Sequence, residues 1–324
     1  MYKESKKSHY KHDIDCETYY NKYYKYKKKY LALKQLEGGS GLESSDTKVL
    51  NRSDMFKEPL LININDYVRK FSSFHDIFDK ILFDNKLLLF KDMHGHLEHI
   101  YYVLSNLQFL KQRHNFNVLF IEMLPLDFEI EFKLNDEAIP LQDKIKSVVD
   151  WFSENWNSKS DHVDLSSNTA YQCLVIYAMY FGYQIYGCDD LETYKETNPE
   201  LFDRYSMNKE ISKKIHNVLE GKKGIGFFGA AHLNMRTTSY QGIPYYLNFY
   251  HSFTDFLVLD ILNKQNNEYG TVGIITENTD VTKNEFGLIK TNANVDYPNY
   301  FIVINDDSLK TKIKAVCLNV NINL

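Results

Sequence analysis

The sequence is poor in proline and cysteine, with only 6 prolines and 4 cysteines among 324 residues. The cysteines are scattered and form no C-x-x-C pair: Cys16, Cys173, Cys188 and Cys317. This spacing argues against a disulfide framework and against a zinc finger. A reducing compartment is the simpler interpretation.

The sequence also lacks long apolar segments. Its N-terminus is polar and lysine-rich, without the apolar core of a secretory signal. The most apolar run, residues 173–187, contains glycine and is shorter than the roughly 18 residues that a membrane span needs. We therefore expect a soluble, intracellular protein that is not secreted.

Three catalytic signatures are missing as well. The segment G-K-K-G-I-G at residues 221–226 precedes a predicted strand, whereas a phosphate-binding loop must follow one. No G-x-S-x-G elbow occurs, and no cysteine has the surroundings of a nucleophile. These absences argue against a P-loop enzyme, a serine hydrolase of the elbow type and a cysteine hydrolase.

What the sequence does contain is an ordinary globular composition with an uneven charge. Hydrophobic residues make up 44% and charged residues 25% of the chain. The net charge is −5, but residues 1–40 hold ten lysines and five acidic residues, so this part carries +5 and the rest carries −10. Such a basic arm on an acidic body can meet nucleic acid, an anionic membrane or an acidic partner.

The composition along the chain predicts three parts. Residues 1–39 form a basic helical arm, because residues 17–36 place Tyr19, Tyr23, Tyr26, Tyr30 and Leu33 at helical spacing before a Gly-Gly cap. Residues 40–58 form a flexible linker, and residues 59–324 form the main domain. The tyrosine stripe favours burial against a partner protein helix, with stacking on nucleic acid as the alternative.

The main domain alternates between apolar runs and helical patterns. We predict helices at residues 65–82, 95–112, 139–153, 168–182 and 200–219, with a further helix from His232. We predict strands at residues 86–90, 117–122, 183–187, 224–228, 244–250, 271–276 and 300–304. This order is typical of an α/β fold with a mostly parallel or mixed sheet that carries helices on both faces.

Titratable side chains follow the first four of these strands. They are Asp92, His94, His96, Glu98 and His99 after the first, Glu122 at the end of the second, Asp189 and Asp190 after the third, and His232 after the fourth. Ligands bind beyond the carboxyl ends of parallel strands, and imidazoles and carboxylates serve there as acids, bases and metal ligands.

Each of these residues also has a structural interpretation. His232 is placed to be a helix cap, Asp92 to cap the helix that follows it, and Glu98 to be a solvated helix residue, while Asp189 and Asp190 are typical of a turn. Their coincidence at one edge favours a functional role for His94, Glu122 and His232.

Four short motifs resemble the superfamily of erythromycin esterases, which includes ChaN-type haem-uptake proteins, TraB/TIKI metalloproteases and a domain of Pasteurella-type toxins. The motifs are DMHGHLE from Asp92, FIEM around Glu122, GAAH ending in His232, and RYSMNKEI from Arg204. The resemblance spans residues 85–250 and makes His96 and Arg204 candidates for substrate binding. Lys91-Asp92 replaces the usual Gly-Glu, which leaves room for a changed substrate or an inactive enzyme.

The resemblance implies two kinds of chemistry. The esterase branch implies a His/carboxylate pair that activates water against an ester or amide of a small molecule or peptide. Here Asp92 or Glu122 orients or deprotonates the water, His94 is the base, and His232 stabilises charge or donates a proton, with Glu98 nearby. The TIKI branch implies a divalent metal held by His94, Glu122 and His232, with His96 and His99 as possible extensions of the site. We favour water activation; the alternative is an inactive virion protein or a protein that binds a metal or haem.

The arm resembles the start of many proteins of giant DNA viruses, through NKYYKYKKKYLALKQLEGG at residues 21–39. This resemblance implies a viral protein of the host cytoplasm or the virion, with the arm as a packaging or sorting tag. Gly38-Gly39 is either a processing site or, more simply, a helix cap with a linker.

Overall fold

The computed structural model describes residues 48–49, 64–92, 97–155, 165–189, 204–233, 241–266, 275–291 and 298–318. At Asp92 and Arg204 it describes only the backbone. The chain divides into two units, Met1–Asp46 and Thr47–Leu324, and every described residue belongs to the second. The predicted arm and nearly all of the predicted linker lie outside the described residues.

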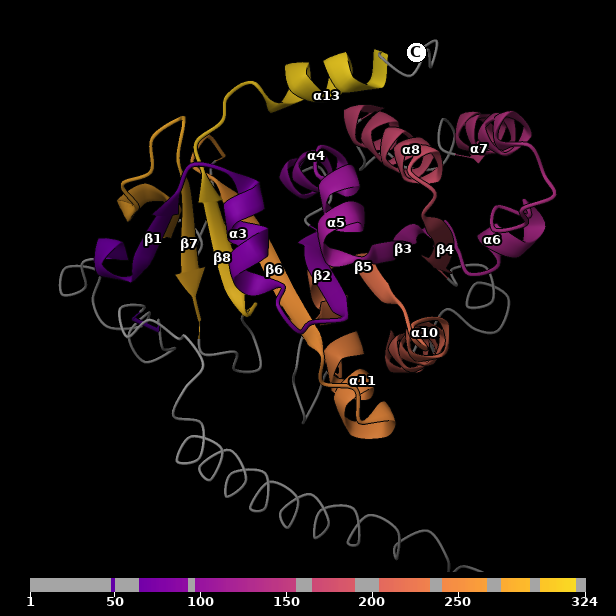
Figure 1. Ribbon diagram of the computed structural model, residues 1–324, viewed down its shortest axis with the longest axis horizontal. Helices are drawn as coiled ribbons and strands as arrows, with labels where there is room; N and C mark the ends of the chain where they lie inside the picture. The colour runs from indigo at the N-terminus through magenta and orange to yellow at the C-terminus, as the bar shows by residue number, and fades with distance from the viewer. Residues whose placement is uncertain are drawn as a thin grey trace, which may run out of the picture. The chain divides into compact units, whose positions relative to one another are not determined.

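The described part is built on an eight-stranded sheet with the order β1-β7-β8-β6-β2-β5-β3-β4 (Figure 1). Neighbouring strands from β8 to β4 run parallel, whereas β7 runs antiparallel to both β8 and β1. The strands are β1 (Val68–Phe71), β2 (Leu87–Asp92), β3 (Phe116–Pro125), β4 (Gln184–Asp189), β5 (Lys223–Gly229), β6 (Phe256–Asn263), β7 (Phe286–Lys290) and β8 (Tyr300–Ile304). The predicted α/β fold with a mixed sheet is confirmed.

Helices cover both faces of this sheet (Figure 1). They are α3 (Phe74–Ile81), α4 (Glu98–Leu104), α5 (Leu107–His114), α6 (Phe128–Glu131), α7 (Leu141–Asn155), α8 (Leu165–Tyr180), α10 (Arg204–Val218), α11 (Ile243–His251) and α13 (Leu309–Leu318), with 3-10 turns η2 (Ile64–Tyr67) and η4 (Ala230–Leu233). Leu88 and Phe90 of β2 pack with the helices α3, α4, α5, α8 and α13, while Leu87 and Leu89 pack with α10 and α11. The central strands read as continuous apolar runs because both of their faces are buried.

Several predicted elements need correction. The predicted strand at residues 244–250 is the helix α11, whose first turn contains Pro244 at a position that proline favours. Residues 275–278 are helical, although residues 271–276 were predicted as a strand. The predicted helix of residues 65–82 begins only at Phe74, after the cap Ser73, whose hydroxyl accepts the Asp76 N–H at 3.2 Å. Before this cap the chain forms η2 and the strand β1.

Other elements were absent from the sequence prediction. These are α6, β6, β7 and α13, of which β6 lies in the middle of the sheet. The predicted helix of residues 95–112 is two helices, because the chain turns between them at Asn106, whose side-chain amide donates to the carbonyl of Tyr102 at 2.7 Å. Among the described helices, none is long and apolar enough to span a membrane.

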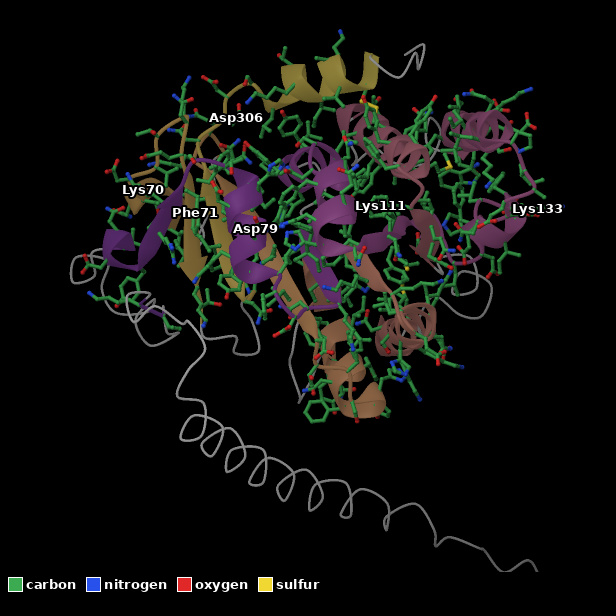
Figure 2. All side chains as sticks on the ribbon, viewed as in Figure 1. Lys70, Phe71, Asp79, Lys111, Lys133 and Asp306 are labelled. Carbon is green, nitrogen blue, oxygen red and sulfur yellow. A yellow bond between two sulfur atoms is a disulfide. The ribbon has the colours of Figure 1, made fainter. Side chains whose placement is uncertain are left out.

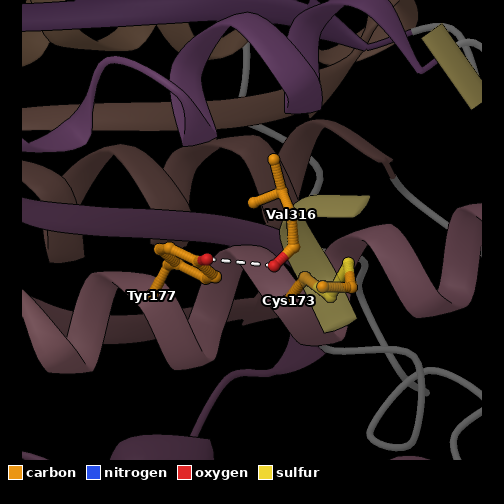
Figure 3. Close-up of a disulfide and its surroundings, with 4 residues drawn as sticks. Cys173, Tyr177 and Val316 are labelled. Atoms are coloured by element: carbon orange, nitrogen blue, oxygen red, sulfur yellow. Dashed lines mark hydrogen bonds between the residues drawn. A yellow bond between two sulfur atoms is a disulfide. The ribbon is translucent and has the colours of Figure 1, made fainter. Parts of the chain in front are cut away.

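A disulfide joins Cys173 on α8 to Cys317 on α13 (Figure 3). Their Cα atoms are 5.7 Å apart, and the hydroxyl of Tyr177 donates to the carbonyl of Val316 at 3.0 Å beside them. The cysteine spacing argues against a disulfide framework, but this pair is bonded. The two residues are 144 positions apart, so no local sequence motif predicts their contact. The argument for a reducing compartment loses its basis, while Cys188 is a free, buried cysteine.

The connection from β8 to α13 is fixed by Asp306, which Figure 2 labels at this junction. Its carboxylate accepts hydrogen bonds from the Tyr102 hydroxyl at 3.2 Å and from the Lys312 ammonium, and its backbone N–H donates to Asn263 at 3.1 Å. These bonds and the disulfide hold both ends of α13 against the α4 and α8 side of the molecule.

Side chains cap the edge of the sheet at β4. The amide of Asn135 donates to the carbonyl of Ile185 and accepts its N–H, both at 2.9 Å. Two residues on, Glu129 accepts the N–H of Gly187 at 3.0 Å and Lys214 donates to its carbonyl at 2.9 Å. Lys214 also pairs with Glu129 at 2.6 Å, which ties α10 to this edge.

Candidate functional site

The candidate site lies at the carboxyl ends of β2 and β5. These two strands are neighbours, and Asp92 and Gly229 face each other at their ends. The chain leaves β2 towards helices on one face, α4 and α5, and leaves β5 towards α11 on the other face. Strands whose connections diverge in this way form the crevice where open α/β sheets bind ligands.

Glu122 reaches this edge from β3, the next strand beyond β5. Side chains alternate along a strand, so Glu122 lies on the same face as Phe120, which packs in the cluster with α10 and α11. Its Oε1 atom is 3.1 Å from Nε2 of His232, and its Oε2 atom accepts the backbone N–H of Gly229. The Glu122 side chain is 13% exposed and that of His232 is 6% exposed, so Glu122 is the more accessible partner.

The other nitrogen of His232 is held by Asn208 of α10. Nδ1 of His232 is 2.5 Å from Oδ1 of Asn208, and Nδ2 of Asn208 donates to the carbonyl of Gln241 at 2.8 Å. Because Oδ1 can only accept, Nδ1 of His232 carries the hydrogen of this contact. Asn208 is fully buried, and the sequence analysis missed it because nothing distinguishes it from other polar residues of its helix.

This arrangement fixes how many protons the pair holds. With Nδ1 as a donor, the 3.1 Å contact between Nε2 and Oε1 needs one further proton, carried by the imidazole or by the carboxyl group. The pair is therefore either imidazolium with carboxylate or imidazole with carboxylic acid. Either form can exchange a proton with a bound molecule, which is the requirement for general acid–base chemistry.

Glu98 lies apart from this pair. It is buried, and its Oε1 atom accepts the amide groups of Asn263 at 3.2 Å and Asn266 at 2.9 Å, so the interpretation of Glu98 as a solvated helix residue is wrong. These partners lie at the end of β6, which β2 and β5 separate from β3. At the usual strand spacing this separation is about 14 Å. The structure does not bring Glu98 to the Glu122–His232 pair.

A second buried polar group surrounds Asp260 of β6. The ammonium of Lys91 is 3.1 Å from its carboxylate, and His99 uses Nε2 to accept the N–H of Ile261 at 3.0 Å. Burial alone raises the pKa of Asp260, but the ammonium of Lys91 outweighs burial and holds this pKa below its ordinary value. Lys91, which departs from the Gly of the resembled motif, thus has an internal partner. The engaged Nε2 of His99 does not support its predicted part in a metal site.

The remaining candidates fall outside the described side chains. His94, His96 and Asp190 lie outside the described residues, and Asp92 and Arg204 are described only in their backbone. Their roles stay predictions. Cys188, before Asp189, is no nucleophile, because burial raises the pKa of its thiol.

No protein-family model matches the sequence, and no curated protein matches it. Three solved structures are similar to it. The type III effector HopBA1 has a TM-score of 0.47 and 17% identity, and the match covers 76% of this chain and 100% of the effector. ChaN of Campylobacter jejuni, solved with cofacial haem, has a TM-score of 0.44 and 15% identity, covering 76% and 96%. A protein of Bacillus cereus has a TM-score of 0.34 and 11% identity, covering 76% and 93%.

These three likenesses are too distant to carry an argument about function. The α/β fold rests on the sheet itself, and the membership in the resembled superfamily stays a prediction. What the site does must be argued from its own residues.

A divalent metal is the cofactor that the resemblance implies, so we tested the donors against it. Nε2 of His232 and Oε1 of Glu122 converge, but the described residues contain no group of three His, Cys, Asp or Glu side chains that fits a metal ion. A catalytic zinc site uses three protein ligands. The donors that the structure describes therefore do not make a metal site, and no step is derived through a metal.

Proposed function

We propose that this protein is a hydrolase of an ester or amide bond that uses Glu122 and His232 as its acid–base pair. The observation that carries the proposal is their 3.1 Å contact at the edge of the sheet, beside the carboxyl ends of the adjacent parallel strands β2 and β5. His232 is oriented by a third group, Asn208, which is the arrangement that catalytic imidazoles use. The substrate class, a small-molecule or peptide ester or amide, comes from the resemblance.

In this proposal a water molecule binds at the accessible side of Glu122. The water loses a proton to the Glu122–His232 pair as its oxygen attacks the carbonyl carbon of the substrate. The C–O or C–N bond then breaks, and the departing alkoxide or amine takes the proton back from the pair. Asp92, the last residue of β2, and His94, two positions later in the sequence, act on the same water in the proposed site.

The proposal is tested with the full-length protein on chromogenic acyl esters and anilides of increasing chain length. We expect Glu122→Gln and His232→Asn to lower kcat/KM about 10²- to 10⁴-fold, the usual contribution of general acid–base catalysis. Matched controls are Glu210→Gln, an exposed residue of α10 that lies 3.7 Å from Lys213, and His75→Asn, an exposed residue of α3. Both controls are expected to keep the wild-type rate.

Folding is checked by circular dichroism and urea unfolding, so that a loss of rate is not a loss of structure. If Glu122→Gln and His232→Asn are folded and turn over substrate at the wild-type rate, the pair is not the acid–base group. If the wild-type protein cleaves no ester or anilide of the series, the proposed hydrolase activity is refuted.

A second candidate function is ligand binding without catalysis. It is favoured because both oxygens of Glu122 and both ring nitrogens of His232 already have hydrogen-bond or ion-pair partners inside the protein. A binding protein predicts a saturable change of absorbance on titration with haem, or retention of a divalent metal after dialysis, in protein that hydrolyses nothing. Elemental analysis and Soret absorbance separate this candidate from the hydrolase.

A further inference from the structure

We propose that Asn208 is a positioning residue that fixes the tautomer of His232, so that Nδ1 carries a hydrogen and Nε2 faces Glu122. Its catalytic consequence rests on the proposed function, but the orientation itself does not. Neither the resemblance nor the sequence analysis assigns a role to Asn208.

The orientation of the Asn208 amide follows from its second contact. Nδ2 donates to the carbonyl of Gln241 at 2.8 Å, and this carbonyl can only accept. Turning the amide by 180° would bring two acceptors, Oδ1 of Asn208 and the Gln241 carbonyl, against each other. Oδ1 must therefore face His232, and at 2.5 Å it requires a hydrogen on Nδ1.

Burial makes this requirement strict. Asn208 has no exposed surface and His232 is 5% exposed, so water cannot easily replace either partner. A buried polar atom without a partner is costly, so the ring does not adopt the tautomer that would present an unprotonated Nδ1 to Oδ1. The imidazole is then held with one nitrogen occupied and the other directed to the carboxylate.

The helix that carries Asn208 is itself fixed in place. Its neighbours Met207 and Ile211 are buried in the cluster on this face of the sheet. Further along the helix, Lys214 bonds to Glu129 at 2.6 Å and to the carbonyl of Gly187 at 2.9 Å. Asn208 thus approaches His232 from a helix tied to the sheet, which suits a group that must hold an imidazole within a fraction of an ångström.

Asparagine also orients without adding charge. An aspartate in its place would bring a second carboxylate to His232, opposite Glu122. With Asn208, Glu122 is the one acidic group among the described side chains that contacts the ring, and Asn208 adds no second carboxylate to compete for the proton of the pair.

The test is a two-bond ¹H–¹⁵N correlation spectrum of the full-length protein labelled at histidine nitrogens, with the His232 signals assigned by their loss in His232→Asn. In the wild type we expect a protonated Nδ1 in every spectrum between neutral and mildly acidic pH. Asn208→Ala should shift the ring to the form with hydrogen on Nε2, bonded to Glu122. Asn208→Asp should restore the hydrogen on Nδ1, because a carboxylate also accepts it. Asn217→Ala, an exposed position on the same helix, is the matched control.

A wild-type ring protonated only on Nε2 overturns the proposal, and this result needs no variant to fold. An unchanged tautomer in folded Asn208→Ala overturns it as well. On a substrate that the wild type cleaves, Asn208→Ala should lower kcat about 100-fold and leave KM unchanged, since a misplaced imidazole transfers the proton poorly. If the spectra behave as expected but no substrate is cleaved, the proposed function fails while the role of Asn208 stands.

Discussion

Reducing the disulfide between Cys173 and Cys317 is expected to weaken the fold strongly. It joins α8 to α13 near the carboxyl end of the described chain, and both residues are fully buried. After reduction the two thiols stay in the same apolar surroundings, where cysteine behaves as a small hydrophobic residue. The main effect of reduction is therefore to free the unfolded chain.

The magnitude follows from the length of the closed loop. The bonded residues are 144 positions apart. In the chain-entropy treatment such a crosslink removes about 17 cal/mol/K from the unfolded state, or about 5 kcal/mol at 25 °C. With a urea slope of about 3 kcal/mol/M, this loss lowers the unfolding midpoint by about 1.7 M. This shift is large against the total stability of an ordinary domain.

The assay is urea unfolding, followed by tryptophan fluorescence, with and without a phosphine reductant. Thiol titration of the unfolded protein provides an independent count. The structure bonds Cys173 to Cys317 and leaves Cys188 free, so the titration should gain two reactive thiols on reduction. The double variant Cys173→Ala/Cys317→Ala should unfold at the midpoint of the reduced wild type and should not respond to reductant.

Two results would refute this reasoning. One is the titration of all cysteines before any reductant is added, which would mean that the bond does not form. The other is a bonded protein whose midpoint does not move on reduction, which would mean that the unfolded chain is not constrained. Cys188→Ala is the control, since it removes a buried cysteine that the disulfide does not involve.

Three further predictions concern the rest of the chain. Burial alone raises the pKa of Asp260, but Lys91 keeps it below its ordinary value, so this carboxylate stabilises the fold above the unfolded-state pKa of about 3.9, and the stability is lost as the pH falls through the lower folded value. Asp260→Asn should therefore flatten the rise of the unfolding free energy with pH below about pH 4 in urea titrations; an unchanged slope would contradict this expectation. A Cβ atom at Gly187 would lie 1.8 Å from a carbonyl oxygen of β3, so Gly187→Ala should unfold or precipitate, whereas Gly221→Asn, at φ +71° with no atom within 4 Å, should keep the thermal midpoint. If the basic arm binds nucleic acid, deletion of residues 1–39 should abolish a steep salt dependence of binding in fluorescence anisotropy; equal binding by the shortened chain would rule the arm out.

The central strands were predictable because their burial on both faces leaves a plain mark in the sequence. The runs KLLLF, NVLFIE and GIGFF became β2, β3 and β5, and YFIVI became β8 with its predicted bounds. The run FLVLDILN of β6 carries the same mark of burial on both faces, so β6 was predictable from the sequence as well.

The failures at the margins have physical causes. Val68–Phe71 fits the helical spacing of Phe74 and Ile77. The segment nevertheless forms β1, because it pairs with the antiparallel strand β7, which lies more than two hundred residues later in the sequence. The segment of α11 is dense in tyrosine and phenylalanine, which favour strands, yet it packs as a helix against α10. In both cases contacts between distant segments override local preference.

For the candidate site, the sequence predicts at which edge of the sheet the residues lie, but not which side chains contact one another there. The rule that ligands lie beyond parallel strands brought Glu122 and His232 to one edge, and in the structure they are 3.1 Å apart. The same rule grouped Glu98 with them, although a helix start can turn a side chain towards another strand, here towards Asn263. The role of Asn208 could not be predicted, because it depends on a hydrogen bond to His232, which lies 24 positions later in the chain.

The amide of Asn135 gives the sheet a closed border at β4. An exposed edge strand has unpaired backbone groups with which a strand of another chain can pair, and natural proteins carry features that prevent such pairing. Here the Asn135 side chain gives the backbone of Ile185 both the hydrogen-bond donor and the acceptor that another strand would provide. Another strand would gain few new hydrogen bonds by displacing the Asn135 amide. The backbone N–H and carbonyl of Gly187 are likewise already bonded, to Glu129 and Lys214. Pairing of two copies strand to strand along Ile185 and Gly187 would therefore require these side-chain hydrogen bonds to break first.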